Sequence, residues 1–383
     1  MMAIYHALGF HMHQPPYNLK LIFDTQNWEA IQIIKCYERA ARYAHIYKDV
    51  AKFHIGFSGI LLEQFMDSRV VERYRNIVDL PHMVESYRTA ENIEFIGMGY
   101  FHPIFPLIPM DDWEEQIRSC TDLIKELFGR KPKGFWPPEI AFSMEMIPTI
   151  KKCGYQYVIV DGVHVFPEKE KDIYMPYIAS FNGEEIFIIP RDRDLSNAQE
   201  SGLDPYWFKN EVSHKVSNSP HPDLPRLVTT WTDGENGGWF RNMDEEAGFF
   251  GHFFSPYMEQ VRKKVMGIEP VTISEFLEKY PTKERAKVRT GAWNIGSTSG
   301  YDLSLWAGTP AQKMALEEIY QACWHYFELK RAHPEKRELL QRARRLILAS
   351  ETSCYLFWGD AWLPKIHECL DEASKLLKQI DRD

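Results

Sequence analysis

Cysteine is scarce in this sequence of 383 residues, and the six cysteines form no Cys-x-x-Cys pair. They are scattered, at positions 36, 120, 153, 323, 354 and 369. Zinc ribbons need closely spaced cysteine pairs, and disulfide frameworks belong to short secreted chains with regular cysteine spacing. The cysteine pattern therefore argues against both classes.

Long apolar runs and blocks of one charge are also missing. No stretch approaches the roughly 20 residues of a membrane helix, and the residues from Met1 to His6 lack a basic region followed by an apolar core. The chain has 45 basic and 54 acidic residues, a formal net charge of −9, which disfavours a nucleic-acid partner. We therefore expect a soluble cytoplasmic protein with no nucleic-acid or membrane partner.

Aromatic residues, in contrast, are abundant, at 14% of the chain with 11 Trp and 19 Tyr. Sugar rings stack well on aromatic faces, so a carbohydrate-binding cleft is one explanation and a large aromatic core is the other. Hydrophobic residues at 44% and charged residues at 26% are ordinary for a globular protein. The length allows one large domain with an appendage, or two domains.

Seven short apolar runs are separated mostly by segments with helical periodicity, and nearly every run ends in polar residues. The predicted strands are 4–9, 52–60, 93–97, 133–136, 155–160, 185–189 and 226–231. Such a repeat of strand and helix predicts an α/β fold, a (β/α) barrel with its site at the carboxyl ends of the strands.

The last part of the chain has a different pattern. From Pro310 to Ile380 it is nearly all helical, with breaks at 333–334 and 358–360. We expect a barrel over residues 1–285 and a mainly helical subdomain over residues 286–383, packed on the barrel. The stretch 199–225 looks irregular and is interpreted as an insertion beside the site.

Glu139 is the most informative position in the sequence. Two prolines directly before it end the fourth strand, so the acid emerges at that strand's carboxyl end. Asp233 follows the seventh strand in a similar way and precedes Gly234. Taken alone, Glu139 could be an acid favoured by a helix N-terminus, and Asp233 could belong to a simple turn. As a pair they match the two carboxyl groups that hydrolysis of a glycosidic bond needs.

Three histidines are further candidates. His11 and His13 alternate at the end of the first strand, so both side chains can lie on one face. Such a pair could bind a metal with a third ligand, or could bond substrate hydroxyls. His102 lies in a loop rich in proline and aromatic residues, 98–109, which either lines a cleft or covers the core.

Four segments resemble, in the same order, the motifs of glycoside hydrolase family 57, whose members are retaining enzymes that act mostly on α-glucans. The segments are His11–Pro15, Gly99–Pro109, Trp136–Glu139 and Trp231–Glu235. The resemblance implies an incomplete (β/α)7 barrel followed by helices, with Glu139 as nucleophile and Asp233 as general acid/base. A fifth segment, 350–360, is also similar, but Cys354 stands where the family often has Asp.

We expect a sugar cleft with no cofactor and no metal. His13 resembles the family's substrate-contacting histidine. The other candidate substrate-binding residues are His11, His102, Trp136, Arg191, Asp192, Trp231, Glu235 and Trp358. For Arg191 and Asp192 a solvated ion pair is the alternative, and Glu235 is a rival for the acid role.

The sequence thus predicts a retaining, amylase-like glycosidase acting on α-1,4-glucans or their oligosaccharides, with transglycosylation as a second outcome. An α-galactosidase activity stays open. The alternative is a metal-dependent sugar deacetylase or α-mannosidase-like hydrolase on a related seven-strand barrel, with His11 and His13 holding zinc. A glucan-binding protein without activity would need one of the two acids replaced, and both are present.

Overall fold

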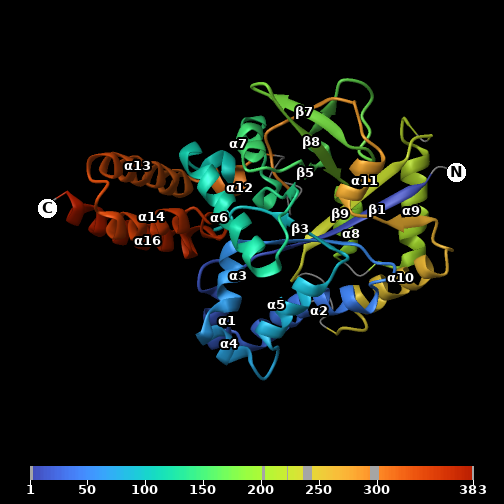
Figure 1. Cartoon of the computed structure of the whole chain (residues 1–383), viewed down its shortest axis with the longest axis horizontal. Coiled ribbons are helices and arrows are strands. Elements are labelled where there is room, and N and C mark those ends of the chain that lie inside the picture. Colours follow the sequence, from blue (N-terminus) through green and yellow to red (C-terminus); the bar gives the residue numbers. More distant parts are fainter. Residues whose placement is uncertain (1–2, 201–202, 222, 236–243, 294–301, 382–383) are drawn as a thin grey trace.

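The computed structural model describes residues 3–200, 203–221, 223–235, 244–293 and 302–381. It has a mixed α/β fold built on a mostly parallel sheet of nine strands (Figure 1). The strands predicted from the sequence are all present in it. They are β1 (Ile4–Met12), β2 (Phe53–Phe57), β3 (Ile93–Gly97), β4 (Gly134–Phe135), β5 (Tyr157–Asp161), β8 (Glu184–Arg191) and β9 (Arg226–Asp233).

These seven strands follow one another in chain order. Parallel pairing links β1 through β2, β3, β4 and β5 to β8, and β9 returns to pair with β1. Just past the end of β8, the Asp192 N–H donates to Thr229 O of β9 at 2.9 Å. Because all seven strands are parallel, their carboxyl ends lie on one side of the sheet, where functional residues collect in α/β folds.

The sequence pattern missed four short strands. They are β6 (Val165–Pro167), β7 (Tyr177–Phe181), β10 (Ile268–Pro270) and β11 (Ala286–Val288). β7 is antiparallel to β8, β10 is parallel to β1, and β6 pairs with β11 in a separate sheet. Three of them, β6, β10 and β11, have only three residues each, which is too short for periodicity to reveal them.

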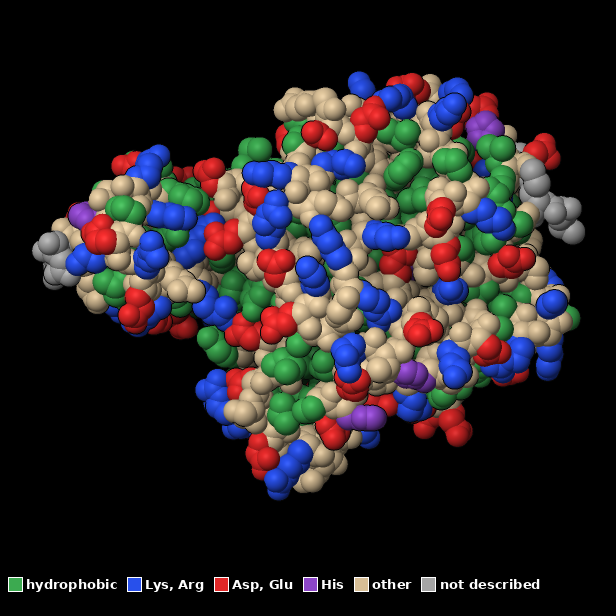
Figure 2. Space-filling model, viewed as in Figure 1, with side chains coloured by type: hydrophobic (Ala, Val, Ile, Leu, Met, Phe, Trp, Pro, Cys, Tyr) green, Lys and Arg blue, Asp and Glu red, His purple; other side chains and the backbone are tan. Residues whose placement is uncertain are grey.

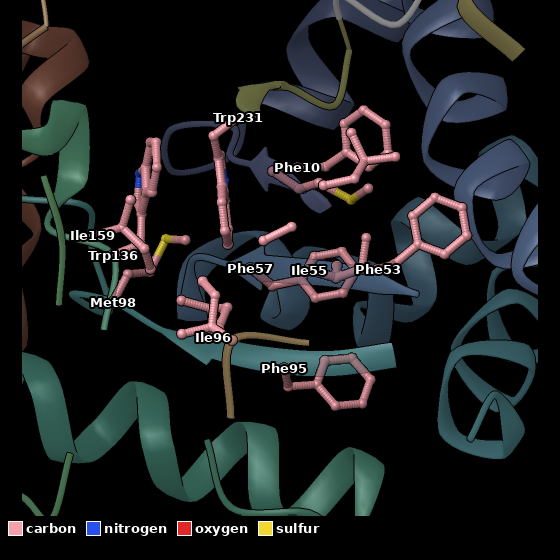
Figure 3. Packing of buried hydrophobic residues seen from close by; sticks show 14 of the residues in the cluster. Phe10, Phe53, Ile55, Phe57, Phe95, Ile96, Met98, Trp136, Ile159 and Trp231 are labelled. Carbon is pink, nitrogen blue, oxygen red and sulfur yellow. The ribbon is translucent and has the colours of Figure 1, made fainter. Parts of the chain in front are cut away.

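The core explains the apolar runs of the sequence. Every residue of β2 and of β5 is buried, as expected for parallel strands that are covered on both faces. Figure 3 shows Phe53, Ile55 and Phe57 of β2 packed among residues of β1 and β3. Trp136 and Trp231 stack on each other in the same cluster, with ring centroids 4.9 Å apart and planes at 19°.

Helices surround the sheet (Figure 1). Within the described residues before position 290 they are α1 (Asn18–Thr25), α2 (Asn27–Ile46), α3 (Gly59–Met66), α4 (Ser68–Tyr74), α5 (Leu80–Thr89), α6 (Met110–Phe128), α7 (Ile147–Lys152), α8 (Arg193–Gln199), α9 (Pro205–Ser217), α10 (Ser255–Arg262) and α11 (Ile273–Lys279). The prediction of an irregular stretch at 199–225 was wrong, because it contains α9. Asp204 caps that helix by accepting from two backbone N–H groups, and Pro205 occupies its first turn.

The C-terminal part is helical, with breaks at both predicted positions. Its helices are α12 (Ser304–Ala307), α13 (Pro310–Ala332), α14 (Arg337–Ser350), α15 (Ser353–Phe357) and α16 (Leu363–Ile380). Figure 1 shows α13, α14 and α16 side by side, projecting from one end of the molecule. They enclose a second apolar cluster that includes Ile319, Ile347 and Ile366. The division at 285/286 stays a prediction, since β11 beyond it pairs with β6.

No helix among the described residues combines the length and the apolarity needed to cross a lipid bilayer. On the face drawn in Figure 2, acidic and basic side chains are interspersed. That distribution agrees with the mixed charge pattern of the sequence.

Candidate active site

Glu139 occupies a strained backbone position just past β4. The strand ends after Phe135, and Pro137 and Pro138 lead to Glu139 and Ile140, whose φ angles are 59° and 52°. Left-handed conformations are uncommon for residues other than glycine and cost of order 1–3 kcal/mol, so they persist where surrounding contacts fix them. The nearest following α-helix, α7, begins only at Ile147. Glu139 therefore lies within a short 3₁₀ turn, Pro138–Ile140, and not at the end of an α-helix.

The contacts that fix Glu139 come from the segment after β11. The Trp293 ring Nε1–H donates to Glu139 Oε2 at 2.6 Å, and the Trp293 backbone N–H donates to Glu139 O at 2.9 Å. Two backbone hydrogen bonds between Phe142 and Gly291, of 3.0 and 3.3 Å, extend this attachment. Trp293 thus holds both the backbone and the carboxyl group of Glu139.

Asp233 is the last residue of β9, and its neighbour is set by strand register. In the β1–β9 pair it lies opposite His11. His11 Nδ1 is 2.8 Å from Asp233 Oδ1, and the Gly234 N–H donates to His11 O at 2.7 Å. A side chain at Gly234 would bring a Cβ within 2.8 Å of Met12. The Asp-Gly dipeptide therefore forms part of a close contact between two strands rather than a simple turn.

Two histidines connect the two acids. His11 Nε2 lies 2.6 Å from His102 Nε2. His102 Nδ1 lies 2.7 Å from Ser353 Oγ and 3.8 Å from Glu139 Oε1. A continuous row of polar groups therefore runs from Asp233 through His11 and His102 to Glu139.

His13 stands beside this row. Its ring stacks on that of His102, with centroids 3.9 Å apart and planes at 8°. His13 Nδ1 is 2.8 Å from Ser58 Oγ, while His13 Nε2 is buried and has no hydrogen-bond partner within the described part of the chain. Burial lowers the pKa of His13 and of His102 well below the usual range of histidine, with a further contribution from the neighbouring histidines. Both rings are therefore neutral at neutral pH.

Burial shifts the pKa of the carboxyl groups in the opposite direction. Burial raises the pKa of Glu139 to about 7, and the charge of Asp233 adds to that rise, whereas His11 and the Trp293 hydrogen bond oppose it. Burial and then the charge of Asp233 also raise the pKa of Glu235 well above its usual range. Perturbed acids gathered at the carboxyl ends of parallel strands are typical of an active site.

Several of the predicted substrate-binding residues are buried. Trp136 and Trp231 are both 0% exposed, and Trp231 lies so close to Gly9 that a Cβ there would come within 2.1 Å of the indole ring. His102 is also 0% exposed. These three rings are buried behind the site. Their direct contact with a sugar stays a prediction.

Arg191 and Asp192 are buried as well, so the alternative of a solvated ion pair does not hold. The Arg191 Nε–H donates to Trp231 O at 2.9 Å, and its guanidinium lies 5.3 Å from the centre of the Trp293 ring. Asp192 caps α8 by accepting from the Leu195 N–H at 3.0 Å. Both residues therefore shape the strand ends around the site.

The two remaining candidates are Glu235 and Trp358. Glu235 accepts from the Tyr37 hydroxyl at 3.4 Å, and the same hydroxyl lies 3.1 Å from His13 O. Trp358, just past α15, is 59% exposed and contacts the Phe357 ring edge-on. The structure thus brings Glu235 close to His13 and leaves Trp358 with an open aromatic face.

Comparison with known proteins now settles the family. Residues 7–289, most of the chain, match the model of Glycosyl hydrolase family 57. The chain belongs to this family. Alpha-amylase 1 of Dictyoglomus thermophilum is 24% identical over 334 residues, which cover 83% of this chain and 43% of that protein. The 4-alpha-glucanotransferase of Thermococcus litoralis is 24% identical over 324 residues, 82% of this chain and 44% of that protein.

A solved structure shows that the fold is shared along the whole chain. The GH57-type branching enzyme from the hyperthermophilic archaeon Pyrococcus horikoshii superimposes with a TM-score of 0.73 over 99% of this chain and 88% of that one, at 17% identity. The family 57 chain described here spans less than half the length of the two curated relatives named above.

The family match does not favour the metal-dependent alternative, and the hydrogen bonds agree. Both ring nitrogens of His11 already face protein groups, Asp233 and His102. In the part of the chain that the structure describes, no group of three or more His, Cys, Asp or Glu residues is arranged to hold a metal ion. In this family 57 protein His11 instead contacts Asp233 and His102, and His102 lies 3.8 Å from Glu139.

The sequence interpretation missed Trp293, Ser58 and Ser353. Each contacts a predicted site residue, at Glu139, His13 and His102 respectively. A signal for Trp293 existed, since it follows Thr290-Gly291-Ala292 in a stretch rich in glycine and aromatic residues. Ser353 lies in the fifth similar segment, 350–360, whereas no local pattern distinguishes Ser58 from an ordinary polar residue.

Proposed function

We propose that the protein is a retaining glycoside hydrolase acting on α-1,4-glucans, with Glu139 as nucleophile and Asp233 as general acid/base. The observation that carries this proposal is the linked pair of acids at the ends of β4 and β9, in a chain of family 57. The two relatives named above, an alpha-amylase and a 4-alpha-glucanotransferase, support α-glucans as the substrate class. The seven parallel strands would form the incomplete (β/α)7 barrel, with residues 286–383 as the helical subdomain.

The geometry suits the two roles. Trp293 binds Oε2 of Glu139 at 2.6 Å, which orients Oε1 for attack on the anomeric carbon. Asp233 protonates the leaving glycosidic oxygen and then activates water, or a sugar hydroxyl when transfer occurs. This two-step scheme retains the anomeric configuration and predicts carboxyl groups about 5–5.5 Å apart.

Protonation states must differ between the two acids for this scheme to work. A nucleophile attacks only as a carboxylate, whereas the acid must begin with a proton. The pKa of about 7 at Glu139 means that this carboxyl group titrates near neutral pH. The charge of Asp233 is one of the causes of this raised pKa.

Substrate contacts are proposed for side chains that can still form a hydrogen bond or stack on a sugar ring. When the Ser58 hydroxyl donates to His13 Nδ1, His13 Nε2 carries a hydrogen that has no protein acceptor among the described residues, and a sugar hydroxyl would supply one. The exposed ring of Trp358 offers a surface on which a sugar ring can stack. Glu235, next to His13 through Tyr37, would accept from a further hydroxyl.

Product analysis with maltoheptaose tests the proposal. Wild type, Glu139→Gln and Asp233→Asn would be incubated with and without a chelator, beside the exposed-acid control Glu72→Gln. Shorter products from wild type and control, unaffected by the chelator and absent with both site variants, would support the proposal. Products longer than maltoheptaose would show that the enzyme also transfers glucan chains. A folded wild type that leaves every α-glucan unchanged would refute the substrate assignment, and loss of activity with the chelator would favour the zinc alternative.

A further inference from the structure

We infer that His11 and His102 form a proton relay between Asp233 and Glu139, and that Ser353 is a positioning residue that sets the direction of the relay. The inference rests on the proposed function, because it assigns a task to the groups between the two proposed catalytic acids. It is carried by three consecutive short contacts, of 2.8, 2.6 and 2.7 Å.

Each of these contacts must contain one hydrogen, which fixes the tautomers. An ionised Asp233 can only accept, so His11 Nδ1–H donates to it. A neutral His11 then has a lone pair at Nε2, and His102 Nε2–H must donate across the 2.6 Å contact. His102 Nδ1 is consequently an acceptor, and the Ser353 hydroxyl donates to it. Every atom of the row has a partner in this arrangement.

A proton on Asp233 reverses the whole row. The Asp233 O–H donates to His11 Nδ1, His11 Nε2–H donates to His102 Nε2, and His102 Nδ1–H donates to Ser353 Oγ. That last hydrogen lies on the ring nitrogen that is 3.8 Å from Glu139 Oε1. Asp233 in its acid form therefore places an N–H beside the ionised nucleophile, which is the pairing that the first catalytic step needs. The Ser353 hydroxyl can serve both directions, because it donates and accepts.

The relay moves one proton with no net charge left on either ring. Glu139 O–H gives its proton to His102 Nδ1, His102 Nε2–H passes to His11 Nε2, and His11 Nδ1–H passes to Asp233. Glu139 ends as the carboxylate, Asp233 ends as the acid, and both histidines change tautomer. The first transfer requires Glu139 Oε1 to approach His102 Nδ1 from 3.8 Å to a hydrogen-bonding distance of about 2.8 Å.

The relay can move the proton between the two acids while substrate fills the site. Burial raises the pKa of Glu139 to about 7, so at neutral pH part of the enzyme carries the proton on the nucleophile. A bound glucan would cover the two acids, whose side chains are 16% and 24% exposed, and would slow exchange with water. The histidine row still reaches both acids from the protein side.

The groups around His102 keep it neutral. His13 stacks on it from one side and is itself bound to Ser58. Burial, followed by the charge of Glu139, raises the pKa of the Cys354 thiol, so the residue next to Ser353 stays uncharged. Glu235 also interacts with Glu139, and burial raises the pKa of Glu235 well above its usual range. A tautomer change, rather than a charged imidazolium, is thus the form in which His102 carries the proton.

Ser353 is rigidly placed for its task. Its backbone N–H donates to His102 O at 3.0 Å, and the neighbouring residue Thr352 forms a β-bridge with Pro103. The Gln116 side chain also connects the two segments. It accepts from the Phe101 N–H at 2.9 Å, next to His102, and donates to the Glu351 carboxyl at 2.7 Å, two residues before Ser353. The segment that supplies Ser353 is therefore attached directly to the loop that carries His102.

The test compares two substrates that differ in their need for an acid. A maltooligosaccharide needs protonation of its leaving oxygen, whereas fluoride leaves from α-maltosyl fluoride without a proton. His102→Asn suits the left-handed backbone at this position (φ 61°) and cuts the link to His11. At pH 8, above the pKa of about 7 at which Glu139 ionises without help from the relay, we expect kcat/KM to fall about tenfold more on the oligosaccharide than on the fluoride.

Ser353→Ala is the second variant, with Ser350→Ala as its matched control. Ser350 is equally buried in the same segment, but its hydroxyl donates to Ile347 O. Ser353→Ala should move the pH profile on the oligosaccharide, and the control should not. An equal loss on both substrates would mean a structural role and overturn the relay, as would an unchanged His102→Asn enzyme. A wild type inactive on both substrates would instead refute the proposed function.

Discussion

Trp293 binds Glu139 twice, through its ring Nε1–H at 2.6 Å and through its backbone N–H at 2.9 Å. The two residues are 154 positions apart in the sequence, and Glu139 sits in a left-handed backbone conformation. The tryptophan thus compensates for the strain of the turn and places one carboxylate oxygen. The same hydrogen bond lowers the pKa of Glu139 and so opposes the effect of burial.

Replacing Trp293 by Phe should weaken the nucleophile while keeping an aromatic ring in place. A hydrogen bond to a charged group contributes roughly 1.5–3 kcal/mol, so kcat/KM on a maltooligosaccharide should fall about tenfold or more. The acid limb of the pH profile should move to higher pH by about one unit, because the ionised form loses a donor. Trp306→Phe is the control, since Trp306 Nε1 is buried without a partner among the described residues. An acid limb that stays in place would contradict the role of the ring N–H.

Glu139→Gln should stabilise the protein above neutral pH. The pKa of Glu139 is about 7 in the folded state, above the ordinary value of 4.5, so ionisation of the buried carboxyl destabilises the wild type as pH rises from about 4.5 to 7. Glutamine removes that penalty and can still accept from Trp293. At pH 8 the free energy of unfolding should rise by up to about 3 kcal/mol, and at pH 4 the two proteins should be alike.

Denaturant unfolding of wild type and Glu139→Gln at both pH values measures this difference. The exposed-acid variant Glu72→Gln should show no such pH-dependent gain. If Glu139→Gln has the same stability difference from wild type at pH 4 and pH 8, Glu139 does not carry the raised pKa.

Position 9 should tolerate no side chain. A Cβ on Gly9 would come within 2.1 Å of the Trp231 ring, so Gly9→Ala must displace a residue that is 0% exposed and stacked on Trp136. Overpacking of this kind typically costs about 1–3 kcal/mol. Thermal unfolding should show a clear fall in Tm, and unchanged stability would mean that the strands near the site are less tightly packed than the structure indicates.

The sequence predicted the parts of this molecule that depend on local patterns. β2 and β5 are apolar runs with clear ends, and Glu139 stands out because two prolines end its strand. The His11–Asp233 contact depends on the register of two strands whose residues are 222 positions apart. The contact of Ser353 with His102 spans 251 positions. Such pairs are set by how loops pack on the strand ends, which periodicity and turn signals do not encode.

Chemical rescue should separate the roles of the two acids. With α-maltosyl fluoride, Asp233→Ala should still form the glycosyl-enzyme, because fluoride needs no proton to leave, and azide should then accelerate turnover and give the α-glycosyl azide. Glu139→Ala cannot form that intermediate, so azide would attack the substrate directly and give the β-azide. On an unactivated maltooligosaccharide, both variants should lose about 10²-fold or more in kcat/KM. The configuration of the azide product, read by NMR, decides the assignment. If Asp233→Ala gave the β-azide and Glu139→Ala the α-azide, the two roles would be exchanged. If rescue followed substitution of Glu235 instead, the rival acid next to Tyr37 would take the place of Asp233.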